Sequence, residues 1–369
     1  MEPDLDRHPL FEATIDHDSG VKSYLLSEHV APAQQSLYFS TPSVSADGKW
    51  LWFMCVHPPG LTRTVGVVSL DHRSPLIRHF PQVQYRGHFE HAACAAPPGE
   101  SPGLYVCQAL EVYKLGVDGS MRYVASLPFQ PHDFTFFQFR PSCVLSISSD
   151  RRRLLLTGLI KERHFIAVVD LRSGEVELLK EMSTDVTYSY FSPTEPDLFF
   201  VTARRRGPEA RLWLMDVPQR KDEPVTAQGW SPSRRLLNHE FWSGDGWLCW
   251  VDLQHGAFEW NPRTHTLQHV WRRPMIHAHA TTQRQMWCAD INTYNWNEKD
   301  VRILLFDRAS GREIPVVNAM PPPSFDYNRV HCHPHPRFVI DDRWLVYTAS
   351  NGRTSTVALC PIQQPAVAT

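Results

Sequence analysis

The stretch Ser45-Ala46-Asp47-Gly48-Lys49, followed by Trp50-Leu51-Trp52-Phe53-Met54, predicts a tight polar turn that leads into a β-strand. Asp-Gly favours turns because glycine accepts backbone conformations closed to other residues, and Trp and Phe are enriched in strands. The same combination of a polar turn and an apolar run returns at residues 148–151, 192–196, 243–246, 282–285 and 340–343. A Pro- and Gly-rich segment, 96–103, precedes another apolar run and completes a series of seven units.

The spacing of these turns predicts the fold class. They recur about every 40 to 50 residues, which is the length of a four-stranded propeller blade. No apolar stretch has the 3.6-residue period of a convincing helix. We therefore predict an all-β protein, a seven-bladed β-propeller that occupies residues 35–369 as one domain, with residues 1–34 as an N-terminal extension. An all-β sandwich would not explain the regular return of one turn.

Composition excludes several classes of partner and location. The formal net charge is -2, and no long basic run is present, so we expect no nucleic-acid or membrane partner. The N-terminal segment is acidic and lacks the apolar core of a signal peptide, and no apolar run is long enough to span a membrane. The cysteines are scattered through strand-like runs, which favours reduced thiols and a cytoplasmic location. The oligomeric state stays open.

Three histidines, His331, His333 and His335, alternate over five residues. In an extended chain, alternate side chains point to the same face, so the three imidazoles would lie together. Neutral imidazole nitrogen is a common ligand of divalent metals, and the sequence therefore predicts a metal site. Pro334 and Pro336 place this segment at the end or edge of a sheet. The alternative is a His-rich surface turn.

Segments that directly precede the turns should converge on the channel, because the first strand of each propeller blade lines it. These segments carry a disproportionate share of the histidines, together with two tyrosines: His91, His132, Tyr188, Tyr190, His239, His277 and His279. The segment before the first turn, 36–39, offers no charged or imidazole group. A channel mouth lined in this way predicts a binding or catalytic pocket. Alternatively, the tyrosines are plain strand aromatics and the histidines serve structure alone.

Three motifs together resemble those of the oligogalacturonate lyases, a family of polysaccharide lyases. They are Asn238-His239-Glu240-Phe241-Trp242, Phe191-Ser192-Pro193-Thr194-Glu195-Pro196 and His333-Pro334-His335-Pro336. The resemblance covers roughly residues 35–360, and its specific motifs lie in the last four blades. It implies a seven-bladed propeller.

The resemblance also implies a metal site. In this family a divalent metal, usually manganese, is held by three histidines and a glutamine. His333 and His335 match two of these histidines, and His277 or His279 matches the third. The glutamine position is occupied by Val330. Either His331 substitutes as a ligand, or the site is altered, so that zinc, calcium or no metal at all are alternatives to manganese.

The catalytic residues implied by the resemblance are His239 as the base and Arg211 as the arginine. Arg329, beside the missing glutamine, would bind substrate, as would His91, His132 and Tyr190. The family usually has a His-x-Gln pair where this chain has Tyr188 and Tyr190, which suggests a different sugar or linkage from digalacturonate. Other propeller lyases resemble this layout in using a tyrosine and a following arginine, and Tyr188 and Arg204 match those parts. Glu240 should point to the opposite face from His239, as a structural residue.

The resulting hypothesis is a carbon–oxygen lyase that acts in pectin degradation or related carbohydrate metabolism. It would cleave a uronate-containing oligosaccharide by metal-assisted β-elimination and give an unsaturated uronate product. The alternative is a non-catalytic propeller that binds a sugar or a protein, since fold does not fix function. Val330 in the place of a metal ligand favours this alternative, whereas the convergent His, Arg and Tyr residues favour the enzyme.

Overall fold

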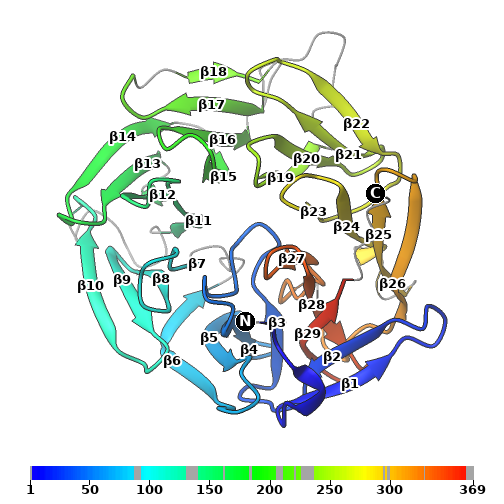
Figure 1. Ribbon diagram of the computed structural model, residues 1–369. Coiled ribbons are helices and arrows are strands. Elements are labelled where there is room, and N and C mark those ends of the chain that lie inside the picture. The colour runs from blue at the N-terminus through cyan, green and yellow to red at the C-terminus, as the bar shows by residue number, and fades with distance from the viewer. Residues whose placement is uncertain are drawn as a thin grey trace.

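The structure, a computed structural model, is a ring of seven antiparallel sheets around a central axis (Figure 1). It describes residues 2–86, 93–129, 140–160, 163–182, 185–204, 211–219, 222–225, 237–293, 296, 300–327 and 329–362. The prediction of a seven-bladed β-propeller is confirmed. These ranges contain almost no helix; a short 3-10 helix, η1 (Leu5–Arg7), lies near the N-terminus. None of the described segments forms a helix of the length and apolarity that a membrane crossing requires.

The first three blades follow the chain without a crossover. Blade one comprises β3 (Ala33–Ser36), β4 (Trp50–Val56), β5 (Thr62–Ser69) and β6 (Ile77–Arg86). Blade two comprises β7 (Ala93–Ala95), β8 (Gly103–Gln108), β9 (Glu111–Gly116) and β10 (Met121–Ser126). Blade three comprises β11 (Arg140–Ile147), β12 (Arg153–Ile160), β13 (Arg163–Asp170) and β14 (Val176–Met182).

The next three blades repeat the pattern. Blade four comprises β15 (Asp185–Phe191), β16 (Leu198–Arg204), β17 (Leu212–Asp216) and β18 (Asp222–Pro224). Blade five comprises β19 (Leu237–Trp242), β20 (Leu248–Asp252), β21 (Gly256–Trp260) and β22 (Leu267–Trp271). Blade six comprises β23 (Ala278–Ala280), β24 (Met286–Ile291), β25 (Val301–Asp307) and β26 (Arg312–Met320).

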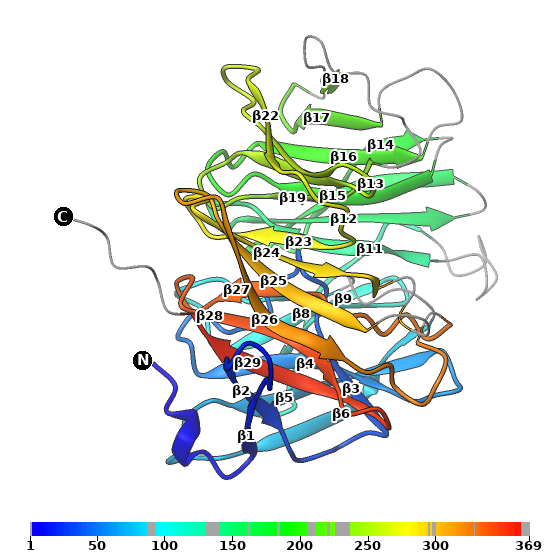
Figure 2. The same ribbon diagram turned by 90° about the vertical axis from the view of Figure 1, so that its right-hand side faces the viewer.

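Blade seven joins the two ends of the chain. From the C-terminal side come β27 (Arg337–Val339), β28 (Trp344–Ser350) and β29 (Ser355–Pro361), and from the N-terminal side β1 (Phe11–Ile15) and β2 (Lys22–Leu26). β2 pairs with β29, with Tyr24 opposite Leu359, so five strands make this blade (Figure 2). The boundary predicted at residue 34 therefore does not separate an extension from the propeller, since β1 and β2 complete its last sheet.

The recurrent polar turn has one hydrogen-bonding design. Ser45, Ser148 and Ser243 each donate their hydroxyl to an aspartate two residues later, at 2.5, 2.6 and 2.7 Å. Each serine hydroxyl also accepts an N–H at the start of the next strand, from Trp50, Arg153 or Trp247, at 3.0 Å in all three turns. The serine and aspartate thereby supply the polar partners that the turning backbone needs. This is the physical reason for the sequence repeat.

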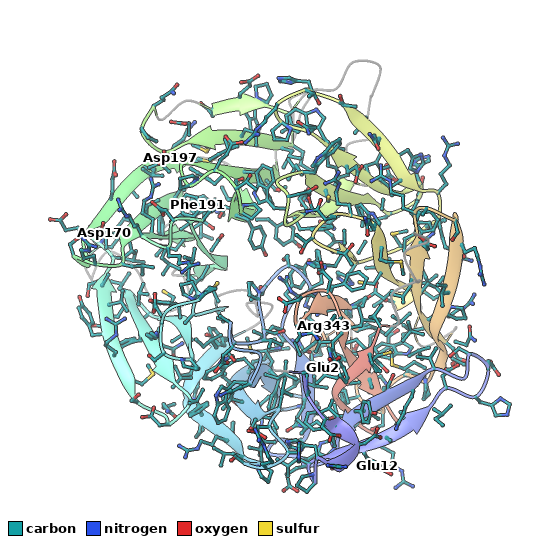
Figure 3. The ribbon with its side chains drawn as sticks, viewed as in Figure 1. Glu2, Glu12, Asp170, Phe191, Asp197 and Arg343 are labelled. Atoms are coloured by element: carbon teal, nitrogen blue, oxygen red, sulfur yellow. The ribbon has the colours of Figure 1, made fainter. Side chains whose placement is uncertain are left out.

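The core is divided among the blade interfaces. Seven clusters of buried apolar side chains lie between successive blades, including one between blades seven and one. A sheet buries each face against a neighbour, so closure of the ring leaves every blade covered on both sides. An ion pair between Glu2 and Arg343, 3.0 Å apart and both labelled near the middle of the ring in Figure 3, also joins the N-terminal segment to blade seven. Because the faces of the blades are covered in this way, we expect the functional site to lie along the central channel.

Candidate functional site

Three buried histidines form a cluster at one end of the channel. His277 directly precedes β23, and His333 and His335 lie between β26 and β27. Each offers a ring nitrogen, and these three atoms all lie within 4.8 Å of one another. We call this group the three-histidine cluster. Between the two histidines predicted as alternatives for the third position, His277 is the one that joins it.

The His331–His335 segment does not reach this arrangement in the predicted way. It is not a strand, and the backbone has positive φ at His331 (51°) and His335 (48°). The turned backbone nevertheless gathers the rings, since the His331 centroid lies 4.5 Å from that of His333 and 5.8 Å from that of His335. His331 is half-buried beside the cluster. The backbone N–H of Thr348 donates to the carbonyl of Pro334 at 2.7 Å and anchors the segment to blade seven.

A carboxylate behind His277 supports the assignment of a metal site. His277 Nδ1 lies 2.8 Å from Asp290 Oδ2, and the His277 backbone N–H donates to Asp290 Oδ1 at 2.8 Å. Since an ionised carboxylate only accepts, Nδ1 carries the proton and Nε2 keeps its lone pair. A carboxylate that orients a histidine in this way is typical of metal sites. The residues present therefore fit a divalent metal with His277, His333 and His335 as ligands.

The residues just before the cluster contribute little to it. Val330 is 2% exposed and packs in the hydrophobic cluster between blades six and seven, so this position supplies no ligand. Arg329 is exposed, and its backbone N–H donates to the carboxylate of Asp326 at 2.9 Å. The ligand shell that the protein provides thus differs from three histidines and a glutamine.

His239 lies against the three-histidine cluster. Its ring centroid is 4.3 Å from that of His277, and the residue is 4% exposed. Burial lowers the pKa of His239 well below the usual value for histidine, and the neighbouring His277 lowers it further. Its Nδ1 atom has no hydrogen-bond partner among the described residues. At neutral pH this ring is uncharged and has a nitrogen that can accept a proton.

A buried ion pair holds Arg211 beside His239. Arg211 Nε donates to Glu240 Oε1 at 3.0 Å, and Arg211 Nη2 donates to Asn238 Oδ1 at 3.1 Å. Burial opposes the charge of Arg211, but the Glu240 carboxylate outweighs it and raises the pKa of the guanidinium. The Glu240 side chain is fully buried, so this charge needs its partner.

Glu240 and His239 point in different directions. Asn238 and Glu240 lie two residues apart in β19 and both bond to Arg211, while His239 between them contacts the histidines. This arrangement agrees with the expectation that Glu240 points away from His239 as a structural residue. The pairing of β19 with β20 also shifts register between Asn238 and Phe241, and His239 has a φ of 59°.

Tyr38 is a site residue that the sequence did not reveal. Its hydroxyl lies 2.9 Å from that of Tyr188, and its ring centroid lies 4.8 Å from that of His335 and 5.8 Å from that of His277. Tyr38 is 1% exposed and Tyr188 is half-buried. The segment 36–39 has no charged or imidazole group, so no site residue was predicted there from the sequence. A tyrosine between apolar residues at the end of an innermost strand was the available signal.

Other predicted site residues lie elsewhere. His279 stacks on Phe241 with centroids 5.3 Å apart, and the Phe338 N–H approaches its Nδ1 at 3.4 Å. Tyr190 lies 2.5 Å from the Ser40 hydroxyl, further along the channel than Tyr188. The Arg204 backbone pairs with Asp185 in β15 and β16, and its side chain is not described. His91 and His132 lie outside the described residues.

Comparison with solved structures places this arrangement on a known scaffold. An oligogalacturonate lyase from Vibrio parahaemolyticus superposes with a TM-score of 0.76 at 16% identity, over 96% of this chain and 97% of that chain. The chain folds as oligogalacturonate lyases do. A structure described as oligogalacturonate lyase in complex with manganese gives the same TM-score and identity over 96% of both chains. The resemblance predicted from the motifs is thus confirmed at the level of the fold.

Two further comparisons limit what can be inferred about function from this structural similarity. A streptogramin B lyase structure superposes with a TM-score of 0.58 at 11% identity, over 96% of this chain and 98% of that chain. No family model and no curated protein matches the sequence. The propeller is thus shared with proteins of different activity, and the function has to be argued from the site residues.

Proposed function

We propose that this protein is a lyase that cleaves a uronate-containing oligosaccharide by β-elimination. The observation that carries the proposal is the three-histidine cluster with Asp290 behind it and His239 and Arg211 beside it. The fold shared with oligogalacturonate lyases supports the same conclusion. We include a cytoplasmic location and a role in the breakdown of pectin or a related polysaccharide.

In this proposal His277, His333 and His335 hold a divalent metal, with manganese as the first candidate. When bound, the metal supplies positive charge that stabilises the anion formed at the substrate carboxylate. Three imidazoles leave room for further ligands, which in other catalytic metal sites are water or substrate. Asp290 keeps His277 in the tautomer that presents Nε2 to the cluster.

His239 is proposed as the general base that takes the proton from C5, beside the carboxylate. The C4–C5 double bond then forms as the C4–O bond breaks. A neutral ring with an unpartnered Nδ1 suits this step, because a protonated imidazole could not accept the proton. Since burial disfavours the imidazolium that results, nearby negative charge on the substrate would help to stabilise it.

Arg211 is proposed to bind the substrate carboxylate. Glu240 and Asn238 take its Nε and one Nη2 proton, and the described residues leave its other N–H groups to donate to an anion. Tyr188, supported by Tyr38, is proposed to give a proton to the leaving oxygen. Arg329, Arg204, His91, His132 and Tyr190 remain predicted contributors to substrate binding or catalysis.

The substrate is proposed to differ from digalacturonate in one sugar or linkage, because Tyr188 and Tyr190 replace the His-x-Gln pair expected from the resemblance. The test is a panel of uronate oligosaccharides assayed for the ultraviolet absorbance of the conjugated product. Product should appear with metal-loaded protein and disappear with chelator. If an oligosaccharide binds tightly but no product forms with any divalent metal added, the result would support a non-catalytic propeller instead.

A further inference from the structure

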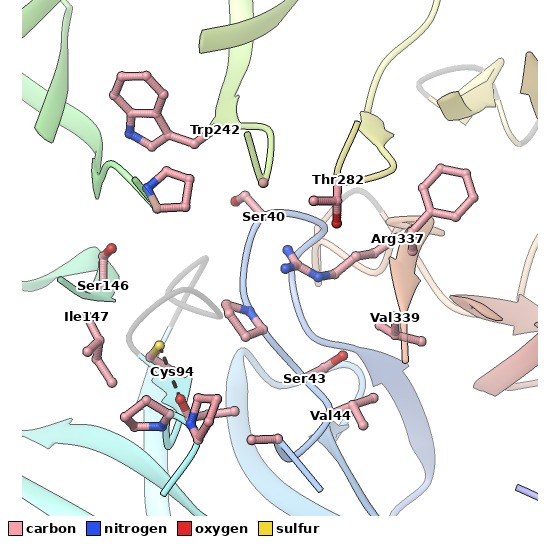
Figure 4. A pocket seen from close by; sticks show the side chains of 18 of the residues that line it. Ser40, Ser43, Val44, Cys94, Ser146, Ile147, Trp242, Thr282, Arg337 and Val339 are labelled. Atoms are coloured by element: carbon pink, nitrogen blue, oxygen red, sulfur yellow. Dashed lines mark hydrogen bonds between the residues drawn. The ribbon is translucent and has the colours of Figure 1, made fainter. Parts of the chain in front are cut away.

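A cavity lies at the other end of the channel from the three-histidine cluster. It has a volume of about 690 Å³ and is lined by residues from all seven blades, around the recurrent turns. None of the cluster histidines lines it, nor do His239, Arg211, Tyr38 and Tyr188. Small-molecule sites commonly have volumes of about 300 to 1,000 Å³, so the space suits a ligand of one or two rings. We call it the turn-side cavity (Figure 4).

Arg337 is the charged group inside this cavity. Its side chain extends from β27 toward the loop that carries Ser40 (Figure 4). Nη1 donates to the Phe39 carbonyl at 2.7 Å, and the part of the chain that the structure describes offers no carboxylate within ion-pair distance. A guanidinium carries its positive charge at any ordinary pH. Arg337 is half-buried in the cavity wall, so an anionic ligand could supply the partner that its charge lacks.

The other charged residues that line the cavity lie on the turns and have partners already. The Asp47 carboxylate accepts from Ser45 and from the Lys49 N–H, and Asp342 accepts from the Thr282 N–H at 2.7 Å. On the same rim, Arg151 donates to the Pro98 carbonyl, and Arg343 pairs with Glu2 and lies 3.7 Å from Asp341. Three aspartates therefore face two arginines on the rim, and Arg337 makes the lining neutral as a whole. Among the described residues, none of these carboxylates lies within ion-pair distance of Arg337.

Polar and aromatic groups around Arg337 complete a site. Ser43 is 1% exposed and its hydroxyl has no hydrogen-bond partner among the described residues. The Phe338 N–H approaches His279 Nδ1, so a neutral His279 carries its proton on Nε2 and can donate from there. Trp242 is half-buried with its indole N–H bonded to the Tyr190 carbonyl at 2.9 Å, which leaves its ring available as an apolar surface.

We propose that the turn-side cavity is a second ligand site, which binds a small organic acid of monosaccharide size through its carboxylate. A guanidinium matches a carboxylate with two parallel N–H bonds, Trp242 offers a face to the body of the ligand, and Ser43 offers a hydroxyl. Apart from Tyr190, which lines the cavity, the site uses none of the residues assigned to the proposed elimination. Ligand binding in this cavity can therefore be tested separately from the elimination reaction.

The test is calorimetric titration of the full-length, chelator-treated protein with galacturonate, and with galactose as the uncharged control. Galacturonate should bind and galactose should bind at least tenfold more weakly. The Arg337→Gln variant should lose about 10- to 100-fold in affinity, because a charged hydrogen-bonding partner is removed. The His17→Ala variant, changed at a fully exposed position, should bind galacturonate as wild type does.

A matched pair of exposed substitutions covers the case in which Arg337→Gln fails to fold. Thr282 is exposed on the cavity rim, so Thr282→Glu adds a negative charge there while Thr282→Gln adds the same bulk without charge. Thr282→Glu should weaken galacturonate binding several-fold relative to Thr282→Gln. Equal binding of galactose, unchanged galacturonate binding in a folded Arg337→Gln variant, or binding of inorganic phosphate alone would each overturn the proposal. So would the absence of any galacturonate binding to the wild-type protein.

Discussion

Glu240 is fully buried and accepts a hydrogen bond from Arg211 Nε at 3.0 Å, so the arginine beside the candidate site is fixed by a charge hidden from water. Glu240→Gln keeps the shape but removes that charge. We expect a loss of about 3 to 5 kcal/mol in the free energy of unfolding, as when one partner of a buried pair is removed. Turnover should also fall, because Arg211 is no longer held for substrate.

Glu259 provides the matched control for that substitution. It is also fully buried and bound to arginines, with Arg284 Nε at 2.9 Å, but it lies in β21, away from the channel histidines. Glu259→Gln should lower stability without lowering turnover per folded molecule. Equal kinetic losses in both variants would show that Glu240 acts through stability alone.

His333→Ala should abolish stoichiometric metal binding, because two imidazoles are a poor substitute for three. Elemental analysis of the purified protein measures this directly, and His17→Ala, at a fully exposed position, serves as the control. In the wild type, metal at 100 times its Kd should raise the free energy of unfolding by about 2.7 kcal/mol. Full metal occupancy in His333→Ala would refute the ligand assignment.

Asp290→Asn should weaken metal binding by about 10- to 100-fold, the usual effect of losing a carboxylate behind a histidine ligand. The amide keeps the size of the side chain but no longer favours the tautomer with the proton on His277 Nδ1. Competition against a chelator of known affinity gives the number. An unchanged affinity would mean that His277 does not bind the metal through Nε2.

His239→Ala should lower turnover by about 100- to 10,000-fold with little change in substrate affinity, as expected for removal of a general base. Tyr188→Phe removes only the hydroxyl that lies 2.9 Å from that of Tyr38, and it should slow the reaction less. The reverse order of effects, measured by single-turnover kinetics, would make Tyr188 the base and remove that role from His239.

His8 should make stability depend on pH. It is 3% exposed, accepts the Leu10 N–H at Nδ1 and has a pKa below its usual 6.5, chiefly because of burial. Below about pH 6.5 the unfolded chain takes up a proton that the folded protein does not, so the free energy of unfolding falls as the pH falls. The limiting slope is about 1.4 kcal/mol per pH unit. His8→Phe should show a correspondingly flatter dependence in denaturant titrations, and parallel curves would contradict the assignment.

The fold could be predicted from the sequence because a polar turn followed by an apolar run recurs at the spacing of a blade. In three of these turns the same Ser–Asp pair supplies hydrogen bonds that the turning backbone requires, so its repetition indicates a repeat of the structure. The boundary at residue 34 was wrong because the strands β1 and β2 precede the first such turn. Nothing local in 11–26 indicates that their partner is β29.

The sequence predicted the site residues that lie close together in one segment. It did not predict those that only the fold brings together. The alternating histidines predict a metal site, and the structure gathers them with His277. Asp290 was missed because it is a single residue in an apolar strand, and its partner His277 precedes the neighbouring strand of the same blade. Tyr38 was missed because its contacts, with Tyr188, His277 and His335, come from other blades.

The pairing of β2 with β29 also means that two neighbouring strands are synthesised at very different times. Thr356 donates its hydroxyl to the Leu26 carbonyl at 2.7 Å across 330 positions of the chain. At about 5 to 20 residues per second, β2 leaves the ribosome roughly 20 to 60 seconds before its neighbour exists. During that interval β1 covers one edge of β2, while the other edge is exposed to strand pairing with other chains. Production of this propeller should therefore depend on how crowded its own nascent chains are.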